Sequence, residues 1–329
     1  MRKNLYLLLV LLPLVSCIKD HYIEISGYAQ GGTYSVKLNT AGVSLPSEAL
    51  KEGIDSIILR IDNSLSGYNK SSLLSRYNAG KEMQPDDLLL EMYAYGRRFY
   101  EETGGALDVA SAPLFDIWGF GFKSGELPSD EKVDSVRRSC GMARMGVDMM
   151  ASRPASLNFN AIAQGYSCDL VADFLKSAGV KDMLINIGGE MYCSGKSPSG
   201  NFWKIGIDRP EDGNVIPGAH LQEVFSVSNV PCGVVTSGNY RKFYIRDGHK
   251  YSHTVDPRTG YPVEHSLLCA TIIAPDAVSA DAYATYCMVV GLEEAKEFII
   301  SREDIEGCLI YDEEGQMKSW ASDGFAIEH

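Results

Sequence analysis

A carboxylate and a hydroxyl, Asp281 and Thr285, lie four residues apart near the start of a predicted helix at 280–290. Residues at this spacing share one helical face, and two oxygen ligands so placed suit a hard cation such as Mg²⁺. Helix capping is the competing interpretation, since Ser279 and Asp281 are both typical first-turn residues, and the segment by itself favours it. Both interpretations stay open at this point.

A second candidate is the loop at 251–262, which reads Tyr-Ser-His-Thr-Val-Asp-Pro-Arg-Thr-Gly-Tyr-Pro. It holds His253, and an imidazole that titrates near pH 6.5 can act as a general base. The alternative is that His253 only hydrogen-bonds within its own turn, for instance toward Asp256. The Asp-Pro and Thr-Gly pairs alone predict no more than a loop.

Several other segments combine glycine with polar or aromatic residues; they are 31–34, 104–121, 158–166 and 236–241. The segment 158–166 leads into a predicted helix at 169–178, so it should present backbone groups at a helix N-terminus, a natural place for a phosphate. None of them matches a P-loop or a G-x-G-x-x-G fingerprint. Taken singly, each predicts a turn or a loop.

The elements that must position these residues are of both kinds. Alternating or apolar runs predict strands at 34–38, 183–187, 203–207, 224–228, 243–245 and 270–273. Helical spacing predicts helices at 48–61 with Ser47 as N-cap, 86–103, 169–178 ended by Gly179, 280–290 and 292–301. Because helices and strands do not strictly alternate, the pattern favours an α+β fold with mixed, largely antiparallel sheets over a doubly wound parallel sheet.

The N-terminus has the pattern of an export signal. Arg2 and Lys3 precede an apolar run at 5–15 that is too short to span a bilayer comfortably. The sequence Leu-Val-Ser-Cys at 14–17 resembles a bacterial lipobox, which predicts cleavage before Cys17 and a lipid on its thiol. We therefore expect a signal peptide at 1–16, a tether at 17–26 and one globular unit at 27–329. An ordinary cleaved signal with an incidental cysteine is the alternative.

The charge and the cysteines exclude several classes of protein. The formal net charge is −13, and loss of Arg2 and Lys3 with the signal peptide makes it −15. Such a chain repels nucleic acid, and it needs a metal ion or backbone donors to hold a compact anion such as a pyrophosphate. Apart from Cys17, the cysteines are scattered without a C-x-x-C pair, which argues against a disulfide framework or a zinc site.

In their order and spacing, these segments resemble the FAD:protein FMN transferase family, the ApbE-type flavin transferases, in a lipoprotein form. The matching blocks are 31–36, 64–78, 104–121, 158–190, 203–210, 236–262 and 280–291. Each block is weak alone, but the ordered set covers the chain from about residue 27 to residue 304. The resemblance implies an enzyme that cleaves FAD and attaches FMN to a Ser or Thr hydroxyl of a partner protein through a phosphoester, releasing AMP.

By that resemblance, FAD binds in a cleft between sub-regions, and the residues that line it are Gln30, Tyr68, Ala106, Leu107, Asp108, Asn158 and Gln164. Asn158 and Gln164 stand where members commonly have aspartate and lysine. A neutral amide pair, which can hydrogen-bond in the same geometry, would thus replace a charge pair. Asn239 also stands where aspartate is common.

The family's Mg²⁺ ligands correspond to the carbonyl oxygen of Ala161 and the side chains of Asp281 and Thr285. With the family in view, the metal interpretation of Asp281 displaces capping. His253 would lie beside the pyrophosphate, where we expect it to be the general base. Asp281 and His253 are thus the predicted catalytic residues.

Three functions remain open from the sequence. In the first, an acceptor hydroxyl attacks the FMN-side phosphorus of FAD while Mg²⁺ polarises the pyrophosphate. In the second, water attacks the same phosphorus, and the protein is an FAD pyrophosphatase. In the third, the protein is a lipoprotein that binds FAD without breaking it, against which Asp281 and Thr285 argue. For each, we expect an exported protein anchored by lipid on the periplasmic side of the inner or outer membrane.

Overall fold

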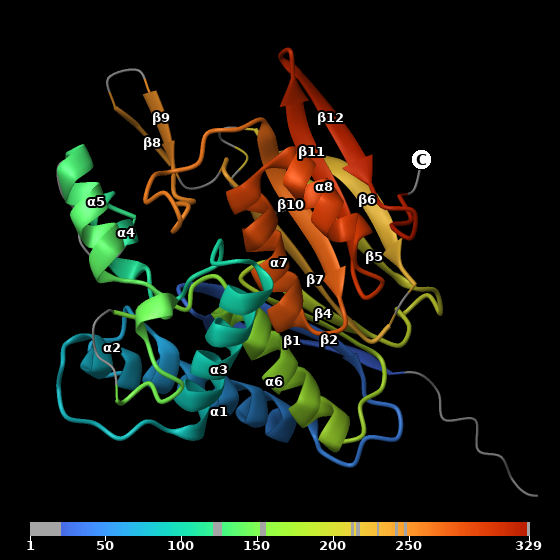
Figure 1. Cartoon of the computed structure of the whole chain (residues 1–329). Coiled ribbons are helices and arrows are strands. Elements are labelled where there is room, and N and C mark those ends of the chain that lie inside the picture. The colour runs from blue at the N-terminus through green and yellow to red at the C-terminus, as the bar shows by residue number, and fades with distance from the viewer. Residues whose placement is uncertain are drawn as a thin grey trace, which may run out of the picture.

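The computed structural model describes residues 21–327 except 121–126, 152–155, 212–213, 215–217, 229, 241–242 and 247–248 (Figure 1). Cys17, the predicted signal peptide and the first residues of the predicted tether lie outside this range. Within the described residues, no helix combines the length and the apolar character that crossing a bilayer requires.

An eight-stranded sheet forms the centre of the molecule, and all its strand pairs are antiparallel. In spatial order its strands are β1 (Tyr22–Ala29), β2 (Gly32–Asn39), β3 (Met183–Ile187), β4 (Glu190–Ser194), β7 (Cys232–Gly238), β10 (Leu267–Ala274), β11 (Glu306–Glu313) and β12 (Gln316–Ala321). Two further antiparallel strand pairs form separate two-stranded sheets: β5 (Trp203–Asp208) with β6 (Leu221–Val227), and β8 (Phe243–Arg246) with β9 (His249–Ser252). The predicted α+β class with largely antiparallel sheets is confirmed.

The helices are α1 (Ser47–Leu65), α2 (Leu73–Asn78), α3 (Asp87–Glu102), α4 (Ala112–Ile117), α5 (Asp130–Ser139), the 3₁₀ turn η1 (Met142–Arg144), α6 (Ala163–Ser177), α7 (Ala277–Val290) and α8 (Leu292–Ile300). Helix α6 packs on β3 and β4, α7 on β7 and β10, and α8 on β11, so these three helices cover one face of the sheet (Figure 1). Helix α1 packs beside α6 and also contacts β1, and Asp55 of α1 accepts a hydrogen bond from the hydroxyl of Tyr34 on β2.

Both faces of the central strands are buried. In β7, Val234 and Val235 point to opposite faces, as successive strand residues do, and both are fully buried. Val235 packs with the cluster around α3 and α7, whereas Val234 packs with Trp203 and Phe225 of the β5–β6 pair. Strand β7 is therefore packed on both faces, and Ser237 near its end lines the candidate site.

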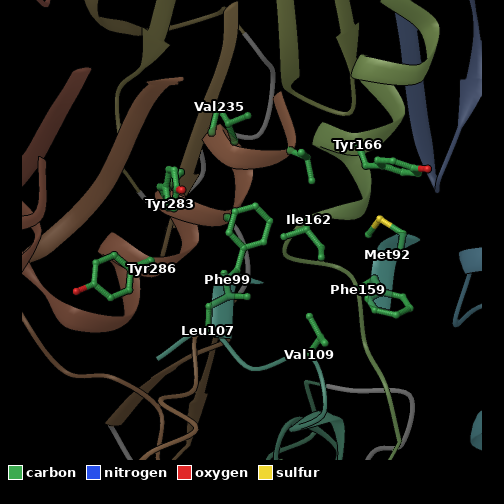
Figure 2. Packing of buried hydrophobic residues seen from close by; sticks show 14 of the residues in the cluster. Met92, Phe99, Leu107, Val109, Phe159, Ile162, Tyr166, Val235, Tyr283 and Tyr286 are labelled. Atoms are coloured by element: carbon green, nitrogen blue, oxygen red, sulfur yellow. The ribbon is translucent and has the colours of Figure 1, made fainter. Parts of the chain in front are cut away.

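The largest core cluster joins α3, α6 and α7 to the segments around 107–109 and 159–162 (Figure 2). Phe99 of α3 meets Tyr283 of α7 edge to face, with ring centroids 5.6 Å apart. Burying an aromatic side chain contributes about 1.5–3 kcal/mol. This packing fixes the glycine-rich segment at 104–108 against the helix that carries Asp281.

Some sequence predictions were wrong in detail. Part of the predicted tether, residues 22–26, belongs to β1, because Ile25 faces the core while the strand pairs with β2. Helix α1 begins at Ser47 itself, and its N-cap residue is Pro46 rather than Ser47. Residues 236–238, expected in a turn, form the end of β7, where β10 pairs with them.

Candidate active site

A cavity of about 470 Å³ brings together residues that are far apart in the sequence. Among its lining residues are Tyr68, Ala106, Leu107, Asp108, Asn158, Ala161, Gln164, His253, Asp281 and Thr285. A second cavity of about 470 Å³ adjoins it at Tyr68, Asn160 and Gln164, and it is lined by Gln30. Each lies within the roughly 300–1,000 Å³ typical of ligand sites. Of the predicted site residues, Cys17 alone is outside the described part of the chain.

Asp281 lies in the second turn of α7 and is buried. Its Oδ2 accepts a hydrogen bond from the backbone N–H of Gly165 at 3.0 Å. Burial, and then repulsion from Glu190, raise the pKa of this carboxyl well above its ordinary value, and the Gly165 N–H opposes the shift. A buried carboxylate next to a second one is a strong attractor for a cation.

The capping interpretation of Asp281 and Ser279 was wrong. The N-cap of α7 is Asp276, whose carboxylate accepts a hydrogen bond from the N–H of Ser279 at 2.8 Å. Asp281 therefore lies inside the helix, where its side chain makes no contribution to the cap.

Two further residues whose oxygen atoms could bind a metal, Thr285 and Ala161, line the same cavity. The hydroxyl of Thr285, one turn after Asp281, lies 3.5 Å from that of Ser237 at the end of β7. Ala161 belongs to the turn just before α6, and its neighbour Ile162 is held there by an N–H bond to the carbonyl of Phe159 at 2.9 Å. No group of three or more His, Cys, Asp or Glu side chains suited to a metal occurs among the described residues.

Helix α6 begins at Ala163, six residues earlier than the sequence predicted, and Gly165 lies in its first turn. A side chain at this position would meet the carbonyl oxygen of Ala277 and the Cβ of Asp281. The absence of a Cβ lets the first turn of α6 approach α7 closely, so that the N–H of Gly165 reaches Asp281.

Replacing Gly165 by Ala is therefore expected to lower the free energy of unfolding by about 1–3 kcal/mol, because the backbone carbonyl of Ala277 cannot move aside as a flexible side chain would. It should also displace Asp281. Denaturant unfolding measures the first effect. Gly32→Ala is the matched control, since its nearest contact would be an ordinary 3.8 Å. Equal stability of the two variants would contradict the argument.

The loop that carries His253 is tied down on both sides of that residue. The Oδ1 of Asn239, directly after β7, accepts hydrogen bonds from the hydroxyls of Ser252 and Thr254, both at 2.8 Å. Farther along, Nε1 of Trp118 donates to the carbonyl of Gly260 at 2.7 Å. His253 is thus held on a braced loop that lines the cavity.

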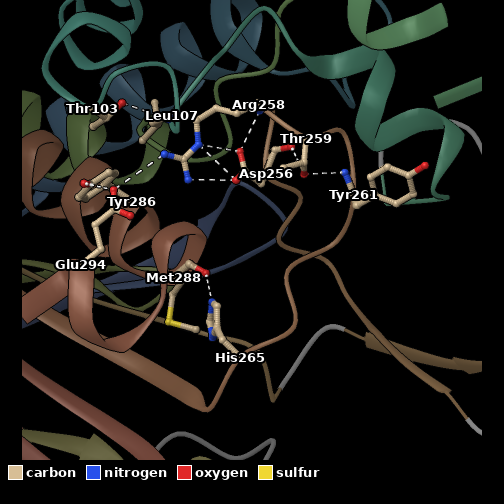
Figure 3. A network of polar contacts seen from close by, with 10 residues as sticks. All are labelled: Thr103, Leu107, Asp256, Arg258, Thr259, Tyr261, His265, Tyr286, Met288 and Glu294. Carbon is tan, nitrogen blue, oxygen red and sulfur yellow. Dashed lines mark hydrogen bonds and ion pairs between the residues drawn. The ribbon is translucent and has the colours of Figure 1, made fainter. Parts of the chain in front are cut away.

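The carboxylate of Asp256 is already engaged. Arg258 donates to it through Nε and Nη2, at 3.1 and 3.0 Å, and also lies 3.8 Å from Glu294 of α8 (Figure 3). The ion pair between Arg258 and Glu294 joins the loop to α8. A hydrogen bond from His253 to Asp256, the alternative considered from the sequence, would have to compete with Arg258.

Asp108 holds two backbone segments of the cavity wall together. Its carboxylate accepts hydrogen bonds from the N–H groups of Ala110 and Met142, at 2.8 and 2.9 Å. Burial raises the pKa of Asp108, and these two amides oppose the shift. The buried Ala106 and Leu107 beside it supply an apolar surface suited to a flat ring.

The expected amide pair is absent: among the described residues, no hydrogen bond joins Asn158 to Gln164. The Oδ1 of Asn158 instead accepts from the N–H of Asn160 at 2.9 Å, two residues on. Nδ2 of Asn160 in turn reaches the hydroxyl of Tyr68 at 3.3 Å, and Tyr68 is 67% exposed at the cavity.

Comparisons with known proteins identify the family of this chain. The ApbE family profile matches residues 30–309. The chain belongs to the ApbE family. It is 31% identical over 292 residues to the FAD:protein FMN transferase of Escherichia coli K12, covering 85% of this chain and 81% of the relative. It is 30% identical over 336 residues to that of Vibrio cholerae, covering 99% and 98%.

Solved structures of ApbE family members have the same fold. The flavin transferase ApbE from Vibrio cholerae superimposes with a TM-score of 0.80 at 28% identity, covering 93% of this chain and 98% of the neighbour. The apo form of the flavinyl transferase ApbE from Pseudomonas stutzeri gives 0.80 at 31% identity, covering 92% and 95%.

Within this ApbE fold, Gln30 has an unusual environment. Its backbone is in the left-handed region, with φ of 51°, and its Nε2 donates to the hydroxyl of Ser167 at 2.5 Å. Its Oε1 is buried, and nothing in the described part of the chain donates to it. A buried acceptor in a cavity wall suits a ligand that brings a donor.

Sequence reasoning did not assign roles to Glu190, Ser237 and Asn239. Glu190 and Ser237 line the main cavity, and Asn239 braces the His253 loop. Each lies at a strand end beside glycine, in Gly188-Gly189-Glu190 or Ser237-Gly238-Asn239. Polar residues next to glycine at strand ends were the available signal.

Proposed function

We propose that this chain is an FAD:protein FMN transferase, which cleaves FAD and attaches FMN through a phosphoester to a Ser or Thr hydroxyl of an acceptor protein. The observation that carries the proposal is the convergence of Asp281, Thr285 and Ala161 with His253 in one cavity. Relatives named for this activity, similar over most of their length, support it.

The residues present fit Mg²⁺. A carboxylate, a hydroxyl and a carbonyl are oxygen donors, and Mg²⁺ is usually held by one or two carboxylates together with substrate phosphates and water. The raised pKa of Asp281 beside Glu190 is the electrostatic counterpart, because a divalent cation relieves that repulsion. When bound, Mg²⁺ would polarise the pyrophosphate and offset the charge on the departing AMP.

The chain's own residues would do the rest. His253 accepts the proton of the acceptor's hydroxyl group. As it does so, the hydroxyl oxygen forms a bond to the FMN-side phosphorus of FAD, and the bond between that phosphorus and the oxygen of the departing AMP breaks. The apolar wall of Ala106 and Leu107 holds flavin or adenine. The braced loop keeps His253 in place, so that little reorganisation is needed during the step.

The deciding experiment incubates the protein with FAD, Mg²⁺ and purified candidate domains that carry surface Ser or Thr residues, and weighs the domains intact. A mass gain equal to FMN less water, with release of AMP, is the expected result. FMN and AMP with no gain would identify an FAD pyrophosphatase, whereas bound but uncleaved FAD would identify a binding protein.

We also propose that the protein is exported and anchored to a membrane through lipid on Cys17, on the strength of the basic start, the apolar run and the Leu-Val-Ser-Cys sequence. Two or more acyl chains anchor a protein stably. Cys17→Ser is expected to abolish lipidation and leave the protein either uncleaved or free of the membrane. Mass spectrometry of the mature N-terminus tests this, and an unmodified start at another residue would refute it.

A further inference from the structure

The proposed metal ligands come from two different helices. Ala161 lies just before α6, whereas Asp281 and Thr285 lie on α7. Their separation therefore depends on how the first turns of α6 and α7 are held together. A shift of one helix against the other would separate the ligands without unfolding either helix.

Three hydrogen bonds join the first two turns of α6 to the first two turns of α7. Oδ1 of Asp169 on α6 accepts from the N–H of Ala277, and its Oδ2 accepts from the N–H of Val278, both at 2.8 Å. One turn earlier on α6, the N–H of Gly165 donates to Asp281 at 3.0 Å. Gly165 and Asp169 lie four residues apart on one face of α6. Their partners, Asp281 and Ala277 respectively, lie four residues apart on one face of α7.

Burying Asp169 is costly. Burial raises its pKa to about 7, the two amides oppose that shift, and Asp276 and Asp173 add to it. No Lys or Arg side chain forms an ion pair with Asp169 among the described residues. Its charge is met instead by the N–H groups at the start of α7, where the helix dipole also favours an anion.

We infer that Asp169 is a positioning residue for the metal site: it fixes the first turn of α7 to α6 and so sets the distance between the carbonyl of Ala161 and the carboxylate of Asp281. The inference rests on the Mg²⁺ site of the proposed function. Asp169 lines neither cavity, so it would act on the ligands through α7, besides the repulsion by which its charge helps to raise the pKa of Asp281.

An ordinary capping role for Asp169 makes a different prediction. Helix α7 already has its own N-cap, Asp276, which bonds to the N–H of Ser279 at 2.8 Å. Asp276 belongs to the N-terminal end of α7 and moves with it, whereas Asp169 belongs to α6. Removing either carboxylate weakens the start of α7, but only Asp169 also connects the two helices.

The test compares Asp169→Asn with Asp276→Ala in the full-length protein, because Asn at position 276 would still cap α7 as Asp does. Mn²⁺ serves as the probe for the Mg²⁺ site, its binding is followed by electron paramagnetic resonance, and FAD affinity is measured without metal. We expect Asp169→Asn to weaken Mn²⁺ binding about 10–100-fold, as loss of a residue that orients metal ligands does. Asp276→Ala, which removes the cap of α7, should lower the melting temperature with Mn²⁺ binding little changed. In both variants, the affinity for FAD without metal should equal that of the wild type.

Equal Mn²⁺ binding by Asp169→Asn and the wild type would overturn the inference, and so would equal weakening by the two variants. If Asp169→Asn does not fold, Asp169→Ser replaces it, because a hydroxyl can still accept one of the two amides. A wild-type protein that binds no Mn²⁺ would refute the proposed metal site itself, which separates that failure from failure of the inference.

Discussion

Asp281→Asn is expected to lower FAD cleavage about a thousandfold, since a metal acting on a phosphoryl oxygen contributes several kcal/mol and about 1.4 kcal/mol corresponds to tenfold in rate. Asn keeps the volume of Asp and an oxygen that can accept from Gly165, so the contact between α6 and α7 survives. Only the charge is lost. Release of AMP from FAD, measured at saturating Mg²⁺, gives the rate.

The stability of this variant separates chemistry from folding. The wild-type carboxylate is buried beside Glu190, which raises its pKa, so removing the charge should leave the melting temperature of the metal-free protein unchanged or higher. Asp281→Ala, in contrast, leaves the Gly165 N–H without its acceptor and should cost about 1–3 kcal/mol. Near wild-type cleavage by Asp281→Asn would refute a metal role for this residue.

His253→Ala is expected to lower turnover at least about a hundredfold, because a positioned base contributes about 10²–10⁴-fold to transfer of a hydroxyl proton. FAD binding should change little. The base acts only when it is deprotonated, so wild-type transfer should fall as the pH drops through its pKa. In His253→Ala that acidic limb should disappear. Rates across the pH range at saturating FAD measure both effects.

His220→Ala is the matched control for this experiment. His220 is exposed, its Nδ1 lies 3.0 Å from Oε1 of Glu211, and it lines neither cavity. Loss of the His220 imidazole should leave both the turnover and the acidic limb of the pH profile unchanged. A His253→Ala protein that keeps most of its turnover, or that loses FAD binding in parallel, would contradict the base assignment.

Local sequence predicted the elements whose signals are local. Amphipathic spacing predicted a helix at 86–103, and α3 begins at Asp87 with Asp86 as its N-cap. All the strands predicted from alternation are present, because that pattern reports which face of a strand is buried. The i and i+4 spacing of Asp281 and Thr285 likewise placed both at one cavity. The remaining site residues came from the resemblance to a family rather than from periodicity.

Long-range contacts decided the rest. The close approach of α6 to α7 depends on Gly165 meeting Ala277, more than a hundred residues away, and no local signal records that contact. The edge strand β1 was mistaken for part of a tether, since its weak alternation becomes a strand only when β2 pairs with it. The sequence alone thus determined the order of the predicted elements, because local patterns follow from residue type and spacing, whereas the kind of chemistry came from the resemblance to a family. Only the tertiary structure decided the buried state of Asp281, its neighbour Glu190 and the bracing of His253 by Asn239, because each depends on the approach of strand ends and helices that the chain separates widely.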